Sequence, residues 1–315
     1  QDDQSGKLKR LHEYLQGGGV PNLFETLDEL MLEPVYTPFA EIANAGYFKF
    51  LWDFMDKGDT QVELSRILEE SVEKFSPFLR GIEIFTQRTL EKELLLTEQR
   101  SLLSSILTMH AEINTKKPSH KIVAEKPAIH PLSQTFTFTQ DHWLALLFWC
   151  FLAPLGRSTM SETLNNEQVL HWITEWKLGR LIRKTIIDMG YSDRESMQIW
   201  QNVELLIKMQ GWEKTLSNTS ESELVQSWFS DPFIQDYLGI NEYDGILWYR
   251  QEAFTRMEAV LWLLDRIHSM QSISTEPGTL QVSSTGEFLK RLHQAAGQSQ
   301  FQVEILLSKL SLDEE

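Results

Sequence analysis

The sequence contains one cysteine, Cys150, so an internal disulfide bond and a thiolate metal cluster are both excluded. Cys150 lies inside the apolar run "HWLALLFWCFLAPL", where we expect a buried and unreactive thiol. The longest apolar run, Trp143 to Leu155, is shorter than the ~20 residues that a bilayer requires. We therefore expect no membrane partner, and the single cysteine fits a reducing compartment such as the cytoplasm.

Positive charge is also scarce, because the chain has 29 Lys and Arg residues but 45 Asp and Glu residues, which gives a net charge of -16. Such a chain repels phosphate backbones, so nucleic acid is not expected as a partner. Hydrophobic residues make up 42% and aromatic residues 11% of the chain, which is enough for a globular core. The start "QDDQSGKLKR" is polar, so we expect no signal peptide. It also lacks an initiator Met, so we expect a processed product or a piece of a longer polypeptide.

Strong catalytic motifs are missing as well. His12-Glu13 has no second histidine four residues further on, as a zinc protease would need. The glycine run in "QGGGVPN" lacks the lysine of a phosphate-binding loop, and "GRSTM" around Ser158 lacks the closing glycine of a nucleophile elbow. No catalytic residue, metal ligand or cofactor is therefore assigned, although carboxylates on distant helices can form a site without leaving a local motif.

Apolar residues recur at helical spacing over most of the chain, which predicts an all-α protein. Pro34 and Pro38 are expected to mark a junction, followed by one long helix over 39–58. Ser76-Pro77 is expected to start another helix, because proline is tolerated in a first helical turn. Helices with a break near Thr97 are expected to follow.

Capping signals mark several later helices. Ser192 with Glu195 forms a capping box, and Asp231-Pro232 is expected to begin a short helix. Gly190 and Gly211 are expected to end two helices.

The helical pattern disappears from Asn114 to Gln140, where prolines are mixed with Lys, His and Ser. We therefore predict an N-terminal helical subdomain over 1–113 and a loop or linker over 114–140. A C-terminal helical subdomain over 141–315 is expected to pack with the first as one unit.

The stretch "LGINEYDGILWYRQEAF", residues 238–254, interrupts the helices. Asp244-Gly245 between "INEY" and "ILWY" is a strong two-residue turn signal, so we predict one small β-hairpin near 240–249. Aromatic rings there can stack on a sugar while amide and carboxylate groups bind its hydroxyls. The candidate ligand-binding residues are Asn241, Tyr243, Asp244, Trp248 and Tyr249. The alternative is structural, with Asp244 as an ordinary turn residue and Trp248 as an anchor on the helices.

A second candidate site is a basic stripe in "HWITEWKLGRLIRK". Its members at helical spacing are Lys177, Arg180, Arg183 and Lys184. They can bind a carboxylate-rich partner surface or another part of the same chain. A solvated helix face is the alternative.

Three segments together resemble a known helical region. "YLGINEYDGILWYRQEAFTRMEAVLWLL", "WKLGRLIRKTIIDMGYSDRESMQIWQNVELLIKMQGW" and "AGYFKFLWDFMDKGDTQVELSRILEESVEKFSPFL" are similar to the region that accompanies some bacterial proteins of the alpha-amylase glycosidase family. The catalytic work of that family depends on a (β/α)8 barrel, and no alternating strand and helix pattern is present here. The resemblance therefore implies an accessory region without its enzyme, in carbohydrate metabolism.

The expected function is a non-catalytic accessory or interaction domain that packs on a catalytic barrel of the same polypeptide or of another protein. Glycoside hydrolase activity would then belong to the barrel and not to this chain. One alternative is a carbohydrate-binding module that takes up oligosaccharide on an aromatic platform. Another is an all-α enzyme whose carboxylates come from distant elements.

Overall fold

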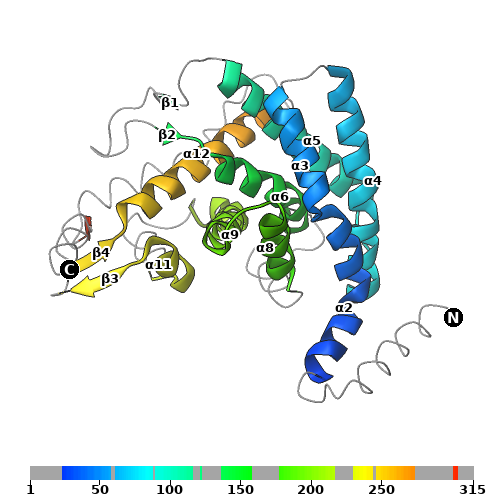
Figure 1. Ribbon diagram of the computed structural model, residues 1–315, viewed down its shortest axis with the longest axis horizontal. Coiled ribbons are helices and arrows are strands. Elements are labelled where there is room, and N and C mark those ends of the chain that lie inside the picture. Colours follow the sequence, from blue (N-terminus) through cyan, green and yellow to red (C-terminus); the bar gives the residue numbers. More distant parts are fainter. Residues whose placement is uncertain are drawn as a thin grey trace.

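The computed structural model describes residues 23–57, 61–87, 89–115, 121–122, 136–157, 177–216, 230–243, 246–273 and 301–303. These residues are mostly helical, which confirms the predicted all-α class (Figure 1). The helices are α2 (Leu23–Ile42), α3 (Ala45–Lys57), α4 (Gln61–Thr86), α5 (Lys92–Thr115), α6 (Gln140–Arg157), α8 (Leu178–Asp188), α9 (Asp193–Leu216), α11 (Pro232–Leu238) and α12 (Gln251–Ile273).

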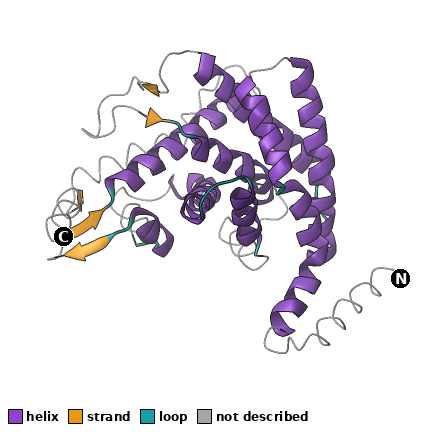
Figure 2. Cartoon of the chain, viewed as in Figure 1, coloured by secondary structure: helices purple, strands orange, loops and turns teal. Residues whose placement is uncertain are grey.

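Short strands accompany the helices, and β3 and β4 lie at the end of the molecule opposite α4 (Figure 2). Strand β1 (Lys121–Ile122) pairs antiparallel with β2 (Phe136–Thr137). Strands β3 (Asn241–Tyr243) and β4 (Ile246–Tyr249) pair antiparallel, and β5 (Phe301–Val303) adds to β4 in parallel. The predicted turn residues Asp244 and Gly245 lie outside the described residues.

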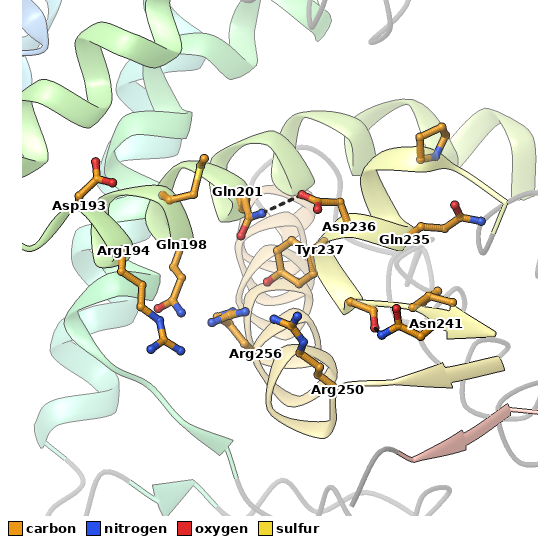
Figure 3. A pocket seen from close by; sticks show the side chains of 14 residues that line it. Asp193, Arg194, Gln198, Gln201, Gln235, Asp236, Tyr237, Asn241, Arg250 and Arg256 are labelled. Atoms are coloured by element: carbon orange, nitrogen blue, oxygen red, sulfur yellow. Dashed lines mark hydrogen bonds between the residues drawn. The ribbon is translucent and has the colours of Figure 1, made fainter. Parts of the chain in front are cut away.

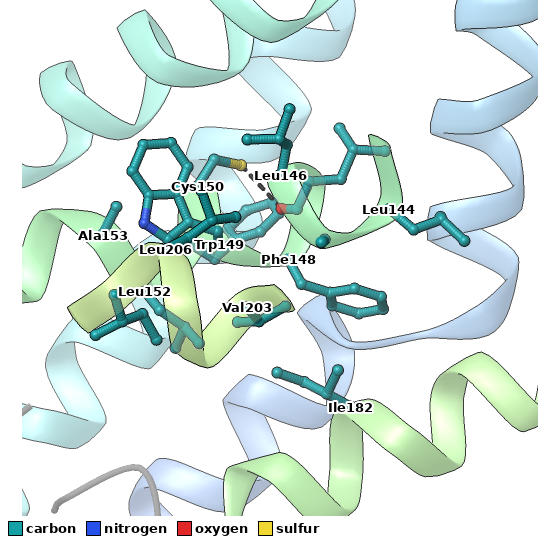
Figure 4. Packing of buried hydrophobic residues seen from close by; sticks show 14 of the residues in the cluster. Leu144, Leu146, Phe148, Trp149, Cys150, Leu152, Ala153, Ile182, Val203 and Leu206 are labelled. Carbon is teal, nitrogen blue, oxygen red and sulfur yellow. Dashed lines mark hydrogen bonds between the residues drawn. The ribbon is translucent and has the colours of Figure 1, made fainter. Parts of the chain in front are cut away.

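Helix α6 occupies the centre of the core. Every residue from 142 to 155 is buried, because its apolar run leaves no polar face for solvent. It packs between α5 and α9, and Phe148 stacks on Phe48 of α3 at a ring-centroid distance of 3.8 Å. Figure 4 shows side chains of α6 packed against residues of α8 and α9. The core therefore includes residues from both sides of the 114–140 segment.

The prolines of the N-terminal helices were predicted wrongly. Pro34 and Pro38 lie inside α2, and Pro77 lies inside α4 instead of starting a helix. The two helices pack closely, since a Cβ atom at Gly81 would lie 1.8 Å from the carbonyl oxygen of Pro34. Packing between helices thus outweighs the local preference of proline for helix ends.

The predicted single helix over 39–58 is divided into the end of α2 and α3, and the predicted break near Thr97 was also wrong. Asn44 separates α2 from α3, because its side-chain oxygen accepts hydrogen bonds from the backbone N–H groups of Gly46 (2.8 Å) and Tyr47 (3.3 Å). Thr97 lies inside α5, which begins at Lys92, and the preceding helix α4 ends at Thr86. Gly211 does not end a helix, since α9 continues to Leu216.

Candidate functional site

A pocket of about 720 Å³ lies between the first turns of α9, helix α11, the start of β3 and the first turns of α12 (Figure 3). Its described lining is largely polar and comes from elements that are distant in the sequence. Three of these residues are arginines, two are aspartates and four carry side-chain amides. The pocket is therefore the candidate functional site.

Helix α11 forms one wall, and its two ends are fixed by local chemistry. The Asp231 side chain accepts hydrogen bonds from the N–H groups of Phe233 (2.8 Å) and Ile234 (3.3 Å), which confirms the predicted helix start. Gly239 ends the helix in the left-handed region at φ 61°. The N–H of Arg250 donates to the Leu238 carbonyl at 2.9 Å, which brings the start of α12 to this end of α11.

Helix α9 forms the opposite wall and begins with the predicted capping box. The Ser192 N–H donates to the Glu195 carboxylate at 2.7 Å, and the Glu195 N–H donates to the Ser192 hydroxyl at 3.3 Å. The Ser192 side-chain and backbone hydrogen bonds lower the pKa of Glu195. Gly190 ends the preceding helix α8 at φ 108°, as predicted. The first turn of α9 is thus fixed by its own capping box and by the end of α8 that precedes it.

Tyr237 lies at the base of the pocket and is almost fully buried. Its hydroxyl donates to the side-chain oxygen of Asn202 at 2.6 Å, which ties α11 to α9. Burial raises the pKa of Tyr237 to about 12, so the phenol remains protonated near neutral pH. The Arg256 guanidinium lies 5.5 Å from the centroid of the Tyr237 ring, within the range of a cation–π interaction.

The three arginines reach the pocket from different elements. Arg194 comes from α9, Arg250 follows β4, and Arg256 lies on α12. Figure 3 shows their guanidinium groups facing the same open space. Arg250 passes directly over Gly239, where an added Cβ atom would lie 2.5 Å from its Nε atom. Glycine at this position therefore allows the left-handed end of α11 and also leaves room for the side chain of Arg250.

The two aspartates of the pocket already have partners. An Nη2 atom of Arg183 lies 2.8 Å from Oδ1 of Asp193 and forms a salt bridge between α8 and α9. The Gln201 amide donates to Asp236 at 3.3 Å and links α9 to α11. Both carboxylates thus take part in structural contacts. The amide of Asn241 donates to the Gly239 carbonyl at 3.1 Å and leaves its side-chain oxygen for another donor.

Of the predicted ligand-binding residues, Asn241 lies in the pocket. Tyr249 is only 2% exposed, and its ring packs 5.1 Å from that of Phe254. Its ring therefore faces the core and has no free face for a sugar. Tyr243 and Trp248 belong to β3 and β4, but their side chains lie outside the described part of the chain, as does Asp244.

The predicted basic stripe is divided between two roles. Arg180 and Lys184 are exposed on α8, and Lys177 precedes the helix with φ 54°. Arg183 instead binds Asp193 of the same chain. The stripe therefore presents only part of its charge outward, because Arg183 contributes to the α8–α9 contact.

The pocket arginines Arg194, Arg250 and Arg256 were not predicted from the sequence. Two signals point toward Arg194 and Arg250 in retrospect: Arg194 lies within the Ser192–Glu195 capping box, and Arg250 follows the predicted hairpin. Neither signal shows that elements about 50 residues apart meet, because that depends on the packing of α9, α11 and α12.

The described residues offer neither a candidate metal cluster nor a membrane-spanning helix. They contain no group of three or more His, Cys, Asp or Glu side chains placed to hold a metal ion. Burial raises the pKa of the Cys150 thiol, which donates to the Leu147 carbonyl at 3.0 Å. Among the described helices, none combines the length and the hydropathy needed to cross a membrane.

Comparison with known proteins adds no assignment. The chain matches no protein-family model, no curated protein and no solved structure. Function must therefore be inferred from the pocket and its residues.

Proposed function

We propose that this chain is a non-catalytic helical accessory domain that binds a ligand or a partner beside an alpha-amylase-like carbohydrate-active protein. The observation that carries the proposal is the position of the pocket. Of its 14 described lining residues, 11 fall within the two C-terminal segments, 176–212 and 237–264, that resemble the helical region of that family.

The chemistry of the lining supports binding over catalysis. A retaining or inverting glycosidase needs two carboxylates free to exchange protons or attack the sugar. In the pocket Asp193 is bound by Arg183 and Asp236 by Gln201, so both carboxylates serve the fold. Arginine and amide side chains form hydrogen bonds without changing protonation near neutral pH. They are suited to hold a ligand.

The partner in this proposal is a catalytic barrel of the same polypeptide or of another protein. Exposed Arg180 and Lys184 on α8 support docking on an acidic surface of that barrel. Replacing both residues by alanine should weaken the complex. The affinity of this variant should also depend less on salt concentration than the affinity of the wild type. Arg66→Ala on α4, where Arg66 is exposed and pairs with Glu63, is a matched control.

Sequencing the locus that encodes this chain tests the proposal directly. We expect an alpha-amylase-type barrel in the same or a neighbouring reading frame. The purified chain alone should release no reducing sugar from starch or maltooligosaccharides. A locus without such a barrel, or turnover that is lost in Glu242→Gln or Asp244→Asn, would reject the proposal.

Carbohydrate binding is a second candidate, favoured by the four amide side chains in the pocket. Amides donate to and accept from sugar hydroxyls, and they would replace the aromatic platform that buried Tyr249 cannot supply. Calorimetric titration with maltotriose should then give a binding isotherm that weakens in Gln198→Ala. The absence of binding at millimolar maltotriose would reject this candidate.

A further inference from the structure

The pocket concentrates positive charge on a chain whose net charge is -16. Arg194, Arg256 and Arg250 follow one another along one side of the pocket, and Gln198 lies beside Arg194 (Figure 3). Guanidinium groups that face a common space repel one another, and this repulsion is relieved when an anion binds between them. The arrangement therefore indicates an anion.

Two of these charges have no counter-charge within the described structure. Arg194 and Arg250 are exposed and form no ion pair with any described residue. The pocket aspartates offset these charges only in part, because Asp193 already pairs with Arg183 and the single charge of Asp236, which the neutral Gln201 amide leaves unchanged, faces three arginines. Arginine is well suited to hold a carboxylate or a phosphate through two parallel hydrogen bonds.

Arg256 differs from the other two because it is half-buried. It lies over the Tyr237 ring, and its Nε atom is buried without a hydrogen bond to any described atom. Burial raises the pKa of Asp141, and the positive charge of Arg256 partly opposes this shift. Part of the attraction of Arg256 for negative charge is therefore directed to Asp141 inside the protein. Arg256 thus supplies a fixed inner charge, while Arg194 and Arg250 lie at the mouth of the pocket.

We propose that this pocket binds a small polyhydroxylated anion, such as a sugar phosphate or a sugar acid. The three arginines hold the charged group, and the amides of Gln198 and Asn241 bind hydroxyl groups. A volume of about 720 Å³ suits a small molecule. The proposal goes beyond the accessory role and stands whether or not a barrel accompanies the chain.

Isothermal titration of the chain at low ionic strength tests the ligand class with five probes: glucose 6-phosphate, glucuronate, inorganic phosphate, maltotriose and a polyglutamate peptide. We expect binding of glucose 6-phosphate or glucuronate, weaker binding of inorganic phosphate, and little or none of maltotriose. The two sugar anions distinguish a phosphate from a carboxylate as the charged group. Raising the salt concentration should weaken binding, because the interaction is electrostatic.

Variants assign the binding to the arginines. Arg194→Gln and Arg250→Gln should each weaken binding of the sugar anion by about tenfold or more (~1.4 kcal/mol or more), because each variant loses a hydrogen bond to a charged group. Both residues are exposed, so folding is expected to survive. Arg66→Gln on α4 removes the same charge from an exposed site and should leave binding unchanged within about twofold.

Four results would overturn the proposal. They are no binding of any anionic probe at millimolar concentration, equal affinity in wild type and the double variant Arg194→Gln/Arg250→Gln, tighter binding of maltotriose than of either sugar anion, and tighter binding of a polyglutamate peptide. The maltotriose result would instead support neutral carbohydrate binding. The peptide result would identify an acidic protein surface as the occupant.

Discussion

Gly239 connects the end of α11 to the pocket through two separate requirements. Its φ of 61° lies in the left-handed region, which costs an L-residue roughly 1–2 kcal/mol. Its missing side chain also leaves room for Arg250, whose Nε atom would lie 2.5 Å from an added Cβ atom. A methyl group here should therefore affect both stability and binding.

Replacing Gly239 by alanine should lower the free energy of unfolding by about 1–2 kcal/mol and displace Arg250. Urea denaturation measures the first effect, and titration with glucose 6-phosphate measures the second. Gly190→Ala is a matched control, because Gly190 also has a positive φ (108°) but no atom within 4 Å of the added Cβ. Gly190→Ala should lose stability and keep its affinity. Equal loss of affinity in both variants would contradict a specific role of Gly239.

Glu204 is a second residue whose surroundings make a measurable prediction. Burial on α9 raises its pKa to about 7, and the nearby Asp236 adds to the shift, while Trp200 and Lys208 oppose it. The folded protein therefore binds this proton more tightly than the unfolded chain, whose value is 4.5. The resulting stability is fully present below the unfolded pKa and is lost as pH rises through about 7.

The variant Glu204→Gln should remove this pH dependence, because glutamine mimics the neutral acid. At pH 8 we expect the variant to be more stable than the wild type by about 3 kcal/mol, from ~1.4 kcal/mol per pKa unit over the shift from 4.5 to about 7. At pH 4.5 the difference should be close to zero. Guanidinium denaturation at both pH values measures the two differences, in which contributions from other titrating groups cancel. The same difference at both pH values would show that charge on Glu204 is not the cause.

At the scale of elements, short-range caps fix the ends of the helices that enclose the pocket. Ser192 and Glu195 exchange hydrogen bonds at the start of α9, and Asp231 caps α11 while its second oxygen lies 2.5 Å from Lys208 Nζ of α9. These caps set where each helix begins. They therefore control how Arg194 on α9 faces Asn241 and the start of α12.

Ser192→Ala should destabilise the protein by about 1 kcal/mol, because the N–H of Glu195 loses its side-chain acceptor at the helix start. Urea denaturation followed by circular dichroism measures this change. Ser230→Ala provides the control, since Ser230 is exposed and precedes the cap of α11. Its effect should stay within about 0.5 kcal/mol. A loss in Ser230→Ala as large as that in Ser192→Ala would mean that the cap itself adds nothing.

The same local chemistry explains which elements the sequence can predict. The starts of α9 and α11 and the end of α8 follow from Ser192, Asp231 and Gly190, whose effects act within a few residues. Pro34 and Pro77 misled the prediction because packing between α2 and α4 decides their structure. Long-range contacts of this kind leave no mark in a local pattern.

The candidate site shows this limit more clearly. Asn241 was predicted as a ligand-binding residue and lies in the pocket, while neighbouring Tyr249 proved to be buried. Arg194 and Arg250 were missed because they are separated along the chain and meet only after α9, α11 and α12 pack. Asn241, at the predicted hairpin, therefore marks one edge of the pocket. The positive charges of the arginines come together there only through tertiary packing.

At the scale of the whole molecule, α6 joins the elements on either side of the 114–140 segment. It contacts α5 on one side and α9 on the other, and Phe148 stacks on Phe48 of α3. Helix α12 also packs against both α5 and α9. Since these contacts share one buried cluster, loss of either half exposes apolar surface of the other.

Cooperative unfolding of the whole chain is the corresponding prediction. Cys150 is fully buried on α6 and its thiol pKa is raised, so a thiol reagent such as Ellman's reagent should react only after the core opens. In a urea series, the midpoint of Cys150 labelling should coincide with the midpoint of helix loss measured by circular dichroism. Substantial helix loss before any labelling would show that part of the chain unfolds independently of α6. Coincident midpoints would mean that the pocket walls on α9 and α12 depend on the same core as the N-terminal helices. Core substitutions such as Phe48→Ala should then also weaken ligand binding under mildly denaturing conditions.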